Sequence, residues 1–207
     1  ATYSKTGMAT LEAHDVALSG GMDGFVARID GVGGKRVWGS YYGGERLDWG
    51  ENIVVDKSFN VYVGGVTKSL LMIATANAFK KNLGGDGDNF LVKFNANGAR
   101  QAATYFGEGA FPGGDDYDAL EGLALDPAGN VYALGVAGVE SGFGSQATSN
   151  AFDKTLSGPT DAVITKFNPA LGRVWSTYYG GSDLELASTF GGGGIAVGAN
   201  SQIHVVG

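Results

Sequence analysis

The chain lacks cysteine and has few histidines, and these shortages exclude several kinds of site. Without cysteine among the 207 residues, neither disulfide bonds nor thiolate zinc sites can form. The two histidines, His14 and His204, occupy positions where other copies of a repeat carry Phe or Tyr, so we expect them to replace packing aromatics. No G-x-S-x-G segment is present to indicate a hydrolase nucleophile.

Long apolar runs are also missing, and none approaches the length of a transmembrane helix. No signal peptide opens the chain, which starts at Ala1, and we therefore expect a processed chain or a segment of a longer one. Basic residues are scarce: 14 Lys and Arg face 21 Asp and Glu, a formal charge of −7 without a basic cluster. Nucleic acid and membrane insertion are therefore not expected.

Glycine, by contrast, is abundant. The chain has 37 glycines, only four prolines and 43% hydrophobic residues, without a G-X-Y period. This composition is typical of an all-β protein with many tight turns.

One sequence segment occurs three times. Its copies DGFVARIDGVGGKRVWGSYYGG, DNFLVKFNANGARQAATYFGE and DAVITKFNPALGRVWSTYYGG start at Asp23, Asp88 and Asp161, so the unit recurs every 65 to 73 residues. That period suits a four-stranded β-blade and is too long for a helical repeat. We interpret residues 1–207 as a single array with units at about 9–73, 74–146 and 147–207.

Each unit predicts four strands. An alternating strand and a short turn lead to a strand ending in two aromatics, which together predict a hairpin. An apolar triplet follows a longer loop and, being apolar on both faces, is predicted to be the most buried strand. A final strand follows a second short turn. The triplets are Ile53-Val54-Val55, Leu123-Ala124-Leu125 and Ile195-Ala196-Val197.

Twisted sheets with two apolar faces favour radial packing, so the predicted fold is an all-β β-propeller built of four-stranded antiparallel blades. About three blades' worth is present, whereas a closed ring needs about four to eight. The chain begins within one blade and ends after two strands of another. We therefore expect part of a propeller of six to eight blades, or packing against repeats of another chain.

The segments GLALDPAGNVYALG and WSTYYGGSD resemble the bacterial β-propeller repeat family often called SBBP. The resemblance extends over the whole chain, although the third copy departs from it at Gly198 and His204. It implies a secreted or bacterial cell-surface protein in which the propeller is a scaffold or adhesive module.

Loop lengths predict where a ligand would bind. The short turns share one end of the predicted array, and the long loops share the other. Because recognition usually resides in long loops on a rigid scaffold, we predict a ligand-binding face at the long-loop end. Its candidate residues are Asp48, Trp49, Glu51, Asp183 and Glu185.

A possible metal site lies in the segment GGDDYD. Asp115, Asp116 and Asp118 offer carboxylate oxygens beside glycines, as a calcium site requires, and calcium is the one cofactor that the sequence suggests. The alternative is an acidic, solvated loop. Asp23, Asp88 and Asp161 recur in every unit and are predicted to close turns.

Three functions remain open. The resemblance favours a non-enzymatic extracellular or cell-surface module that binds other propeller repeats, protein chains or glycans. One alternative is a propeller enzyme acting on a polysaccharide or lactone with calcium, since glycosidases use paired carboxylates. The other is an architectural spacer.

Overall fold

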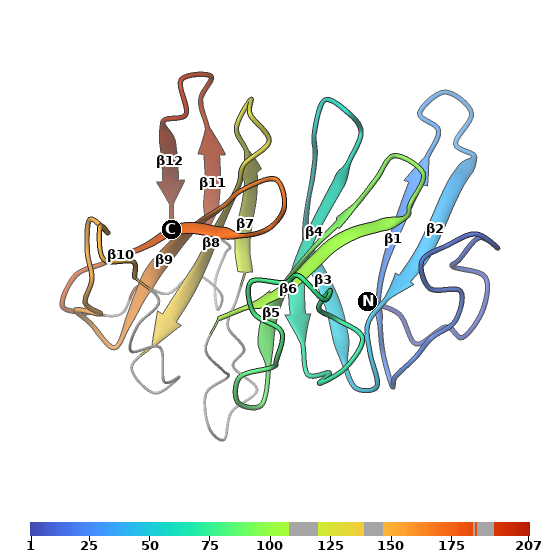
Figure 1. Cartoon of the computed structure of the whole chain (residues 1–207), viewed down its shortest axis with the longest axis horizontal. Coiled ribbons are helices and arrows are strands. Elements are labelled where there is room, and N and C mark those ends of the chain that lie inside the picture. The colour runs from blue at the N-terminus through green and yellow to red at the C-terminus, as the bar shows by residue number, and fades with distance from the viewer. Residues whose placement is uncertain (108–119, 139–146, 184, 186–192) are drawn as a thin grey trace.

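The structure, a computed structural model, describes residues 1–107, 120–138, 147–183, 185 and 193–207. These residues form an all-β fold in which every pair of neighbouring strands is antiparallel, as predicted (Figure 1). Two four-stranded sheets are flanked by two hairpins. The described strands form an open array without a closed ring.

The strands follow one another along each sheet without crossovers. One hairpin is β1 (Gly24–Ile29) and β2 (Arg36–Tyr42). The first sheet contains β3 (Asp48–Val55), β4 (Val61–Thr67), β5 (Asp88–Phe94) and β6 (Arg100–Phe106). The second contains β7 (Leu120–Leu125), β8 (Val131–Gly138), β9 (Thr160–Phe167) and β10 (Arg173–Tyr179). The other hairpin is β11 (Gly194–Val197) and β12 (Ile203–Val206).

Each hairpin corresponds by sequence to one half of a complete sheet. By sequence, β1 and β2 match the third and fourth strands of each sheet, and β11 and β12 match the first and second. Each sheet therefore takes its first two strands from one sequence unit and its last two from the next.

The apolar core lies between successive sheets. Tyr42 of the β1–β2 hairpin packs on Phe90 and Phe94, at ring distances of 5.0 and 5.8 Å. Phe106 of the first sheet packs edge-on against Phe167 of the second, at 5.4 Å. Each aromatic contact joins two sheets, so burial of these rings stabilises the stacking of sheets.

The first strands of successive sheets, β3, β7 and β11, are called the inner strands below. They contact one another: β3 lies beside β7, and β7 lies beside β11. Their burial corrects a prediction, because the apolar triplets are not the most buried strands. Ile53 and Val55 in β3 are 57% and 53% exposed, whereas every residue of β4 is buried. Among the described strands, β7 alone has an inner strand on each side, β3 and β11, and its Leu123 is accordingly buried. Inner strands are thus covered by their inner neighbours.

The outer edge of each fourth strand is covered by the segment that begins a unit. Thr10 bonds Gly39 of β2 through backbone and side chain, and Thr75 and Thr148 bond β6 and β10 in the same way. These segments occupy hydrogen-bonding groups that an open sheet edge would expose.

The six turns within the hairpins are short and lie at one end of the sheets (Figure 1). At the other end, the connection from β4 to β5, residues 68–87, is long, as predicted, but that from β2 to β3, residues 43–47, is as short as the turns, because β3 already begins at Asp48. The short turns span residues 30–35, 56–60, 95–99, 126–130, 168–172 and 198–202.

Candidate functional site

Asp48, the first residue of β3, is completely buried. Its carboxylate accepts hydrogen bonds from Gly44 N and Ser69 Oγ, both at 2.8 Å, and from Thr67 Oγ1. Burial raises the pKa of Asp48 above its ordinary value, and the hydrogen bonds oppose that rise. The prediction of Asp48 on an exposed binding face is therefore corrected: this carboxylate anchors the loop between β2 and β3 from inside.

A second buried carboxylate, Asp23, approaches Asp48 around Gly43. A Cβ atom added to Gly43 would lie 2.6 Å from Asp23 Oδ1 and 2.8 Å from Asp48 Oδ2, so only glycine fits between them. Burial raises the pKa of Asp23, and the charge of Asp48 adds to the rise. The sequence analysis did not predict this pair of carboxylates. The sequence feature that could have indicated it is the glycine that follows the aromatic end of a strand, as Gly43 follows Tyr42.

The same arrangement recurs in the second sheet. A Cβ atom on Gly180 would lie 2.5 Å from Asp161 Oδ1 and 2.9 Å from Glu185 Oε2. Glu185 Oε1 accepts a hydrogen bond from Gly181 N at 2.9 Å, as Asp48 does from Gly44. Glu185 is half-buried, whereas Asp183 in the same loop is exposed.

The three recurring aspartates close turns, as predicted. Backbone N–H groups four residues earlier donate to each carboxylate: Ser19 to Asp23 at 2.8 Å, Gly84 to Asp88 at 2.7 Å and Ser157 to Asp161 at 2.9 Å. Asp88 also pairs with Lys80 Nζ at 3.0 Å.

Glu51 occupies a β-bulge in β3. It faces no residue of β4, because Gly50 pairs with Gly65 and Asn52 with Gly64. Glu121 occupies the same bulge in β7. Such a bulge re-aims a side chain, and Glu121 Oε2 accepts a hydrogen bond from Gly193 N at 2.9 Å, beside β11. The two glutamates thus lie where inner strands meet.

Burial among protein atoms raises the pKa of Glu51 from 4.5 to about 7, and the charge of Glu121 contributes to the rise. Hydrogen bonds from the Leu120 backbone and the Trp49 side chain oppose it. The residue also keeps an exposed surface, so its carboxyl group has both protein neighbours and access to water. The Trp49 side chain thus lies beside the Glu51 carboxyl group within β3, and the binding face itself stays a prediction.

The predicted face is otherwise divided between the two sheets. Trp49 and Glu51 lie in β3, whereas Asp183 and Glu185 follow β10.

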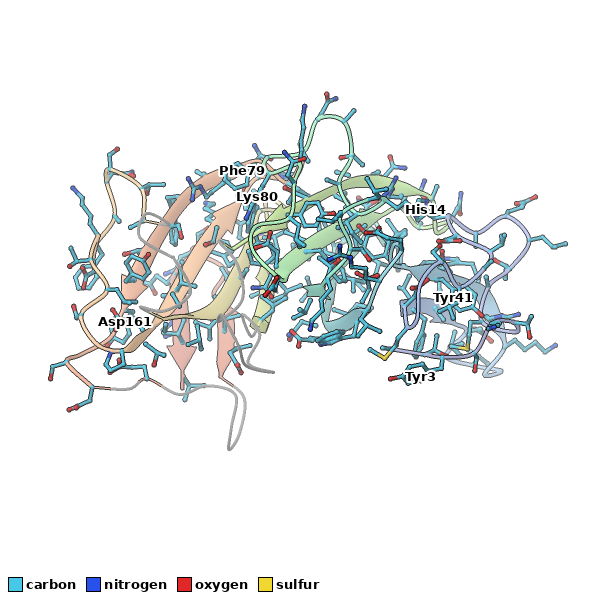
Figure 2. The ribbon with its side chains drawn as sticks, turned by 90° about the horizontal axis from the view of Figure 1, so that it is seen from below. Tyr3, His14, Tyr41, Phe79, Lys80 and Asp161 are labelled. Carbon is cyan, nitrogen blue, oxygen red and sulfur yellow. The ribbon has the colours of Figure 1, made fainter. Side chains whose placement is uncertain are left out.

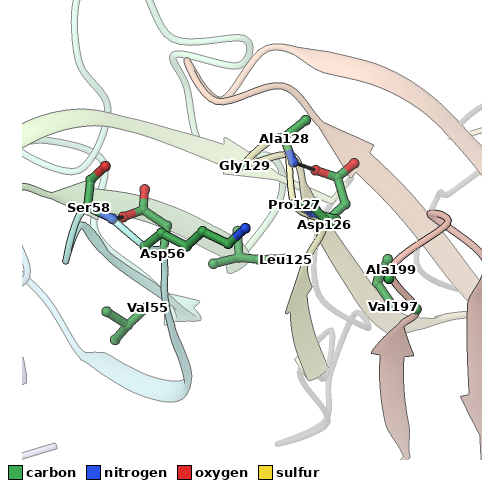
Figure 3. Close-up of a pocket in the computed structure, with 12 residues that line it drawn as sticks. Val55, Asp56, Ser58, Leu125, Asp126, Pro127, Ala128, Gly129, Val197 and Ala199 are labelled. Carbon is green, nitrogen blue, oxygen red and sulfur yellow. Dashed lines mark hydrogen bonds between the residues drawn. The ribbon is translucent and has the colours of Figure 1, made fainter.

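A cavity of about 360 Å³ lies at the opposite, short-turn end (Figure 3). It is lined by equivalent residues of three turns: Val55, Leu125 and Val197 end the inner strands, and Asp56 and Asp126 begin their turns. The sequence analysis did not identify this cavity, because it searched for a binding site by loop length. The feature that could have indicated it is that three turns at equivalent positions of the repeat lie at the same end of the sheets.

Hydrogen bonds occupy the acids of this cavity. Asp126 accepts from Ala128 N and Asn130 N at 2.9 Å, from Asn130 Nδ2 at 2.7 Å and from Tyr132 OH at 3.1 Å. Asp56 has the same set. Burial acts to raise the pKa of both acids, but these hydrogen bonds outweigh it and the pKa falls below the ordinary value. Both side chains are therefore ionised anchors of their turns.

No group of three or more potential metal ligands occurs within the described ranges. Asp115, Asp116 and Asp118 lie outside the described residues, so the calcium site stays a prediction. The ring of His14 lies 6.1 Å from those of Tyr42 and Phe94, and partial burial against protein atoms, followed by the charge of Arg100, lowers its pKa. The residue keeps an exposed surface, as do the equivalent Phe79 and Phe152, so this position is not part of the buried core. His204 in β12 is exposed.

Comparison with known proteins gives no further identification. Across its described ranges the chain contains no helix that is long and apolar enough to cross a bilayer. No protein-family model matches the sequence, and neither does any curated protein.

Proposed function

We propose that this chain is part of a β-propeller that acts as a non-enzymatic scaffold and presents its long-loop end to a protein or glycan partner. The observation that carries the proposal is the use of the recurring polar residues. Asp56 and Asp126 hold turns, and Asp23 and Asp161 hold loops. The polar residues that recur in the units thus stabilise turns and loops, whereas the sequence differences among the three units are concentrated in the long loops.

The burial of the inner strands supports the radial arrangement. The inner strand β7 has an inner strand on each side and is largely buried, whereas β3 and β11, each with one such neighbour, are more exposed to solvent. Further sheets placed around a common axis would cover them. The resemblance to the SBBP repeat supports a secreted or cell-surface location within the same proposal.

Binding to glycan and protein arrays tests the scaffold proposal. We expect a ligand whose binding is weakened by Trp49→Ala or Asp183→Asn at the long-loop end. Lys57→Ala in the β3–β4 turn is the control at the other end and should leave binding unchanged. Equal loss in the control, or no ligand on any array, would favour the architectural spacer.

A second candidate rests on Glu51, whose near-neutral pKa beside Glu121 resembles the paired carboxylates of glycoside hydrolysis. A screen of polysaccharides and lactones tests it. Hydrolysis that disappears in both Glu51→Gln and Glu121→Gln would establish an enzyme. Activity that survives both variants, or none in the parent chain, would leave the scaffold proposal in place.

A further inference from the structure

Asn89 is a polar residue in the apolar space between the first and second sheets. It is only 5% exposed. Its side chain lies on the same face of β5 as that of Leu91, two residues along the strand, and Leu91 packs with Phe106 and Phe167 between the sheets. The Asn89 amide therefore faces the second sheet. Its Oδ1 atom is buried and accepts no hydrogen bond from the described residues, although buried polar atoms in proteins are nearly always hydrogen-bonded.

The second sheet presents a polar group at the same place. Thr165 of β9 is 4% exposed, and its side chain shares a face of the strand with that of Phe167, which contacts Phe106 of the first sheet. The Oγ1 atom of Thr165 lies 2.7 Å from Ser176 Oγ, and either hydroxyl can donate. A hydroxyl has one hydrogen and two lone pairs, so this contact leaves Thr165 able to form a further hydrogen bond.

Comparison of the repeat units shows that this polarity belongs to one junction. Asn89, Thr165 and Ser176 are all buried. The β1–β2 hairpin meets the first sheet through equivalent strands, and there the three equivalent residues are small or apolar: Gly24, Val92 and Ala103. The last two of these belong to the apolar core of the hairpin junction. Since that junction forms without polar groups at these positions, the polar set between the two complete sheets must be explained by what it contacts.

A small cavity lies between the polar groups of the two sheets. Its lining includes Asn89 of β5, Gly107 after β6, and Val163 and Thr165 of β9. The volume of about 10 Å³ suits one water molecule and nothing larger. Lys80, labelled in Figure 2, donates to the carbonyl oxygen of Gly107, so this oxygen already has a partner. Within the described lining, Asn89 Oδ1 is the buried side-chain acceptor that lacks a donor.

The chemistry of the lining selects the occupant. All of its described residues are uncharged, and a buried ion without a charged partner would be costly. An apolar occupant could not donate to Asn89 Oδ1. Water can, because it carries two hydrogens and two lone pairs, and it can also bond Thr165 Oγ1 of the second sheet. Buried waters make about two to four hydrogen bonds, and these two side chains supply the first two.

We propose that this cavity is a binding site for one structural water molecule, which donates to Asn89 Oδ1 and bridges it to Thr165 Oγ1. The first and second sheets are then joined by a polar bridge in addition to their apolar core. Waters that bond otherwise unpaired buried groups are fixed parts of a fold and are costly to remove. The inference depends neither on the proposed ligand nor on closure of a ring, because every group in it belongs to the two complete sheets.

A crystal structure of the parent chain at high resolution tests the site directly. We expect one ordered water within about 2.6–3.2 Å of both Asn89 Oδ1 and Thr165 Oγ1. A dry cavity, or a protein donor bonded to Asn89 Oδ1 in place of water, would overturn the inference.

Nuclear Overhauser effects between water and methyl groups test the site in solution, with two buried valines as a matched pair. Val163 lines the cavity, whereas Val92, the counterpart of Thr165, is buried at the apolar hairpin junction. We expect a signal from long-lived water at the Val163 methyl groups and none at those of Val92. No signal at Val163 would contradict a bound water. Equal signals at both valines would show that water enters regardless of the polar groups, and would overturn their role.

Substitution of the two partners tests the bridge. Thr165→Val keeps the shape of the side chain but removes the hydroxyl, so the water signal at Val163 should be lost, whereas Thr165→Ser keeps the hydroxyl and should keep the signal. Asn89→Leu removes the acceptor and should also lose it. A signal that persists in Thr165→Val would overturn the bridge, and one that persists in Asn89→Leu would overturn the site. The methyl spectrum of each variant reports whether it is folded, and the parent measurements decide the proposal if a variant is not.

Discussion

At the residue scale, the carboxylate of Asp126 accepts three hydrogen bonds from its own turn and a fourth from Tyr132 of β8. Gly198 takes this position in the third turn and has no carboxylate to offer. The carboxylate anchor is therefore missing from the third turn, where only the backbone hydrogen bonds from Gly198 N to Gln202 O at 2.8 Å and from Ser201 N to Gly198 O at 2.9 Å correspond to those of the other turns.

We expect Asp126→Ala to lower the free energy of unfolding by about 2–3 kcal/mol, because hydrogen bonds to a buried charged group are lost and their donors are left unpaired. Urea denaturation measures the change. Asp126→Asn, which keeps one acceptor oxygen, should lose less. Equal losses in the two variants would show that the charge, and not the accepting oxygen, holds the turn.

Glu51 gives a second prediction at this scale. Because its pKa is about 7 in the folded chain and 4.5 is its ordinary value, the folded state holds this proton more tightly than the unfolded state. The stability contributed by protonated Glu51 is complete below pH 4.5 and is lost as the pH rises through about 7.

Glu51→Gln should therefore reduce the loss of stability between acidic and neutral pH. The measurement is the unfolding free energy of parent and variant at several pH values, with Glu12→Gln as an exposed control. A parent and variant that decline in parallel would contradict the assigned pKa.

At the element scale, two glycines face each other between β3 and β4, and the close approach of the strands depends on one of them. A Cβ atom on Gly65 would lie 2.1 Å from Trp49 O, whereas one on Gly50 would meet nothing closer than Val63 Cγ1, at 3.4 Å. The tight approach accompanies the bulge that carries Glu51.

We expect Gly65→Ala to lower the free energy of unfolding by about 1–3 kcal/mol, since backbone atoms must shift to admit the methyl group. Gly50→Ala is the matched substitution across the same strand pair and should cost less. Thermal and urea unfolding of both variants provide the comparison, and a reversed order would contradict the described register.

Most strands and turns could be predicted from the sequence, because they follow local patterns of residues. The alternation at Phe90, Val92 and Phe94 identifies β5, and the recurrence of Asp23 and Asp161 identifies closed turns. The exposure of Ile53 was not predictable, since it depends on a neighbouring inner strand and not on the triplet. The bulge at Glu51 and the carboxylate pair around Gly43 likewise depend on strand register and loop path.

At the scale of the whole molecule, the segments that begin each unit protect the outer edges of the sheets. Through Thr10, Thr75 and Thr148 they occupy the outer edges of β2, β6 and β10, which strands from neighbouring molecules could otherwise extend. Lateral stacking into fibrils through these edges is thereby discouraged. A polypeptide built this way can lengthen by adding units in tandem, because each unit brings the segment that covers an outer edge.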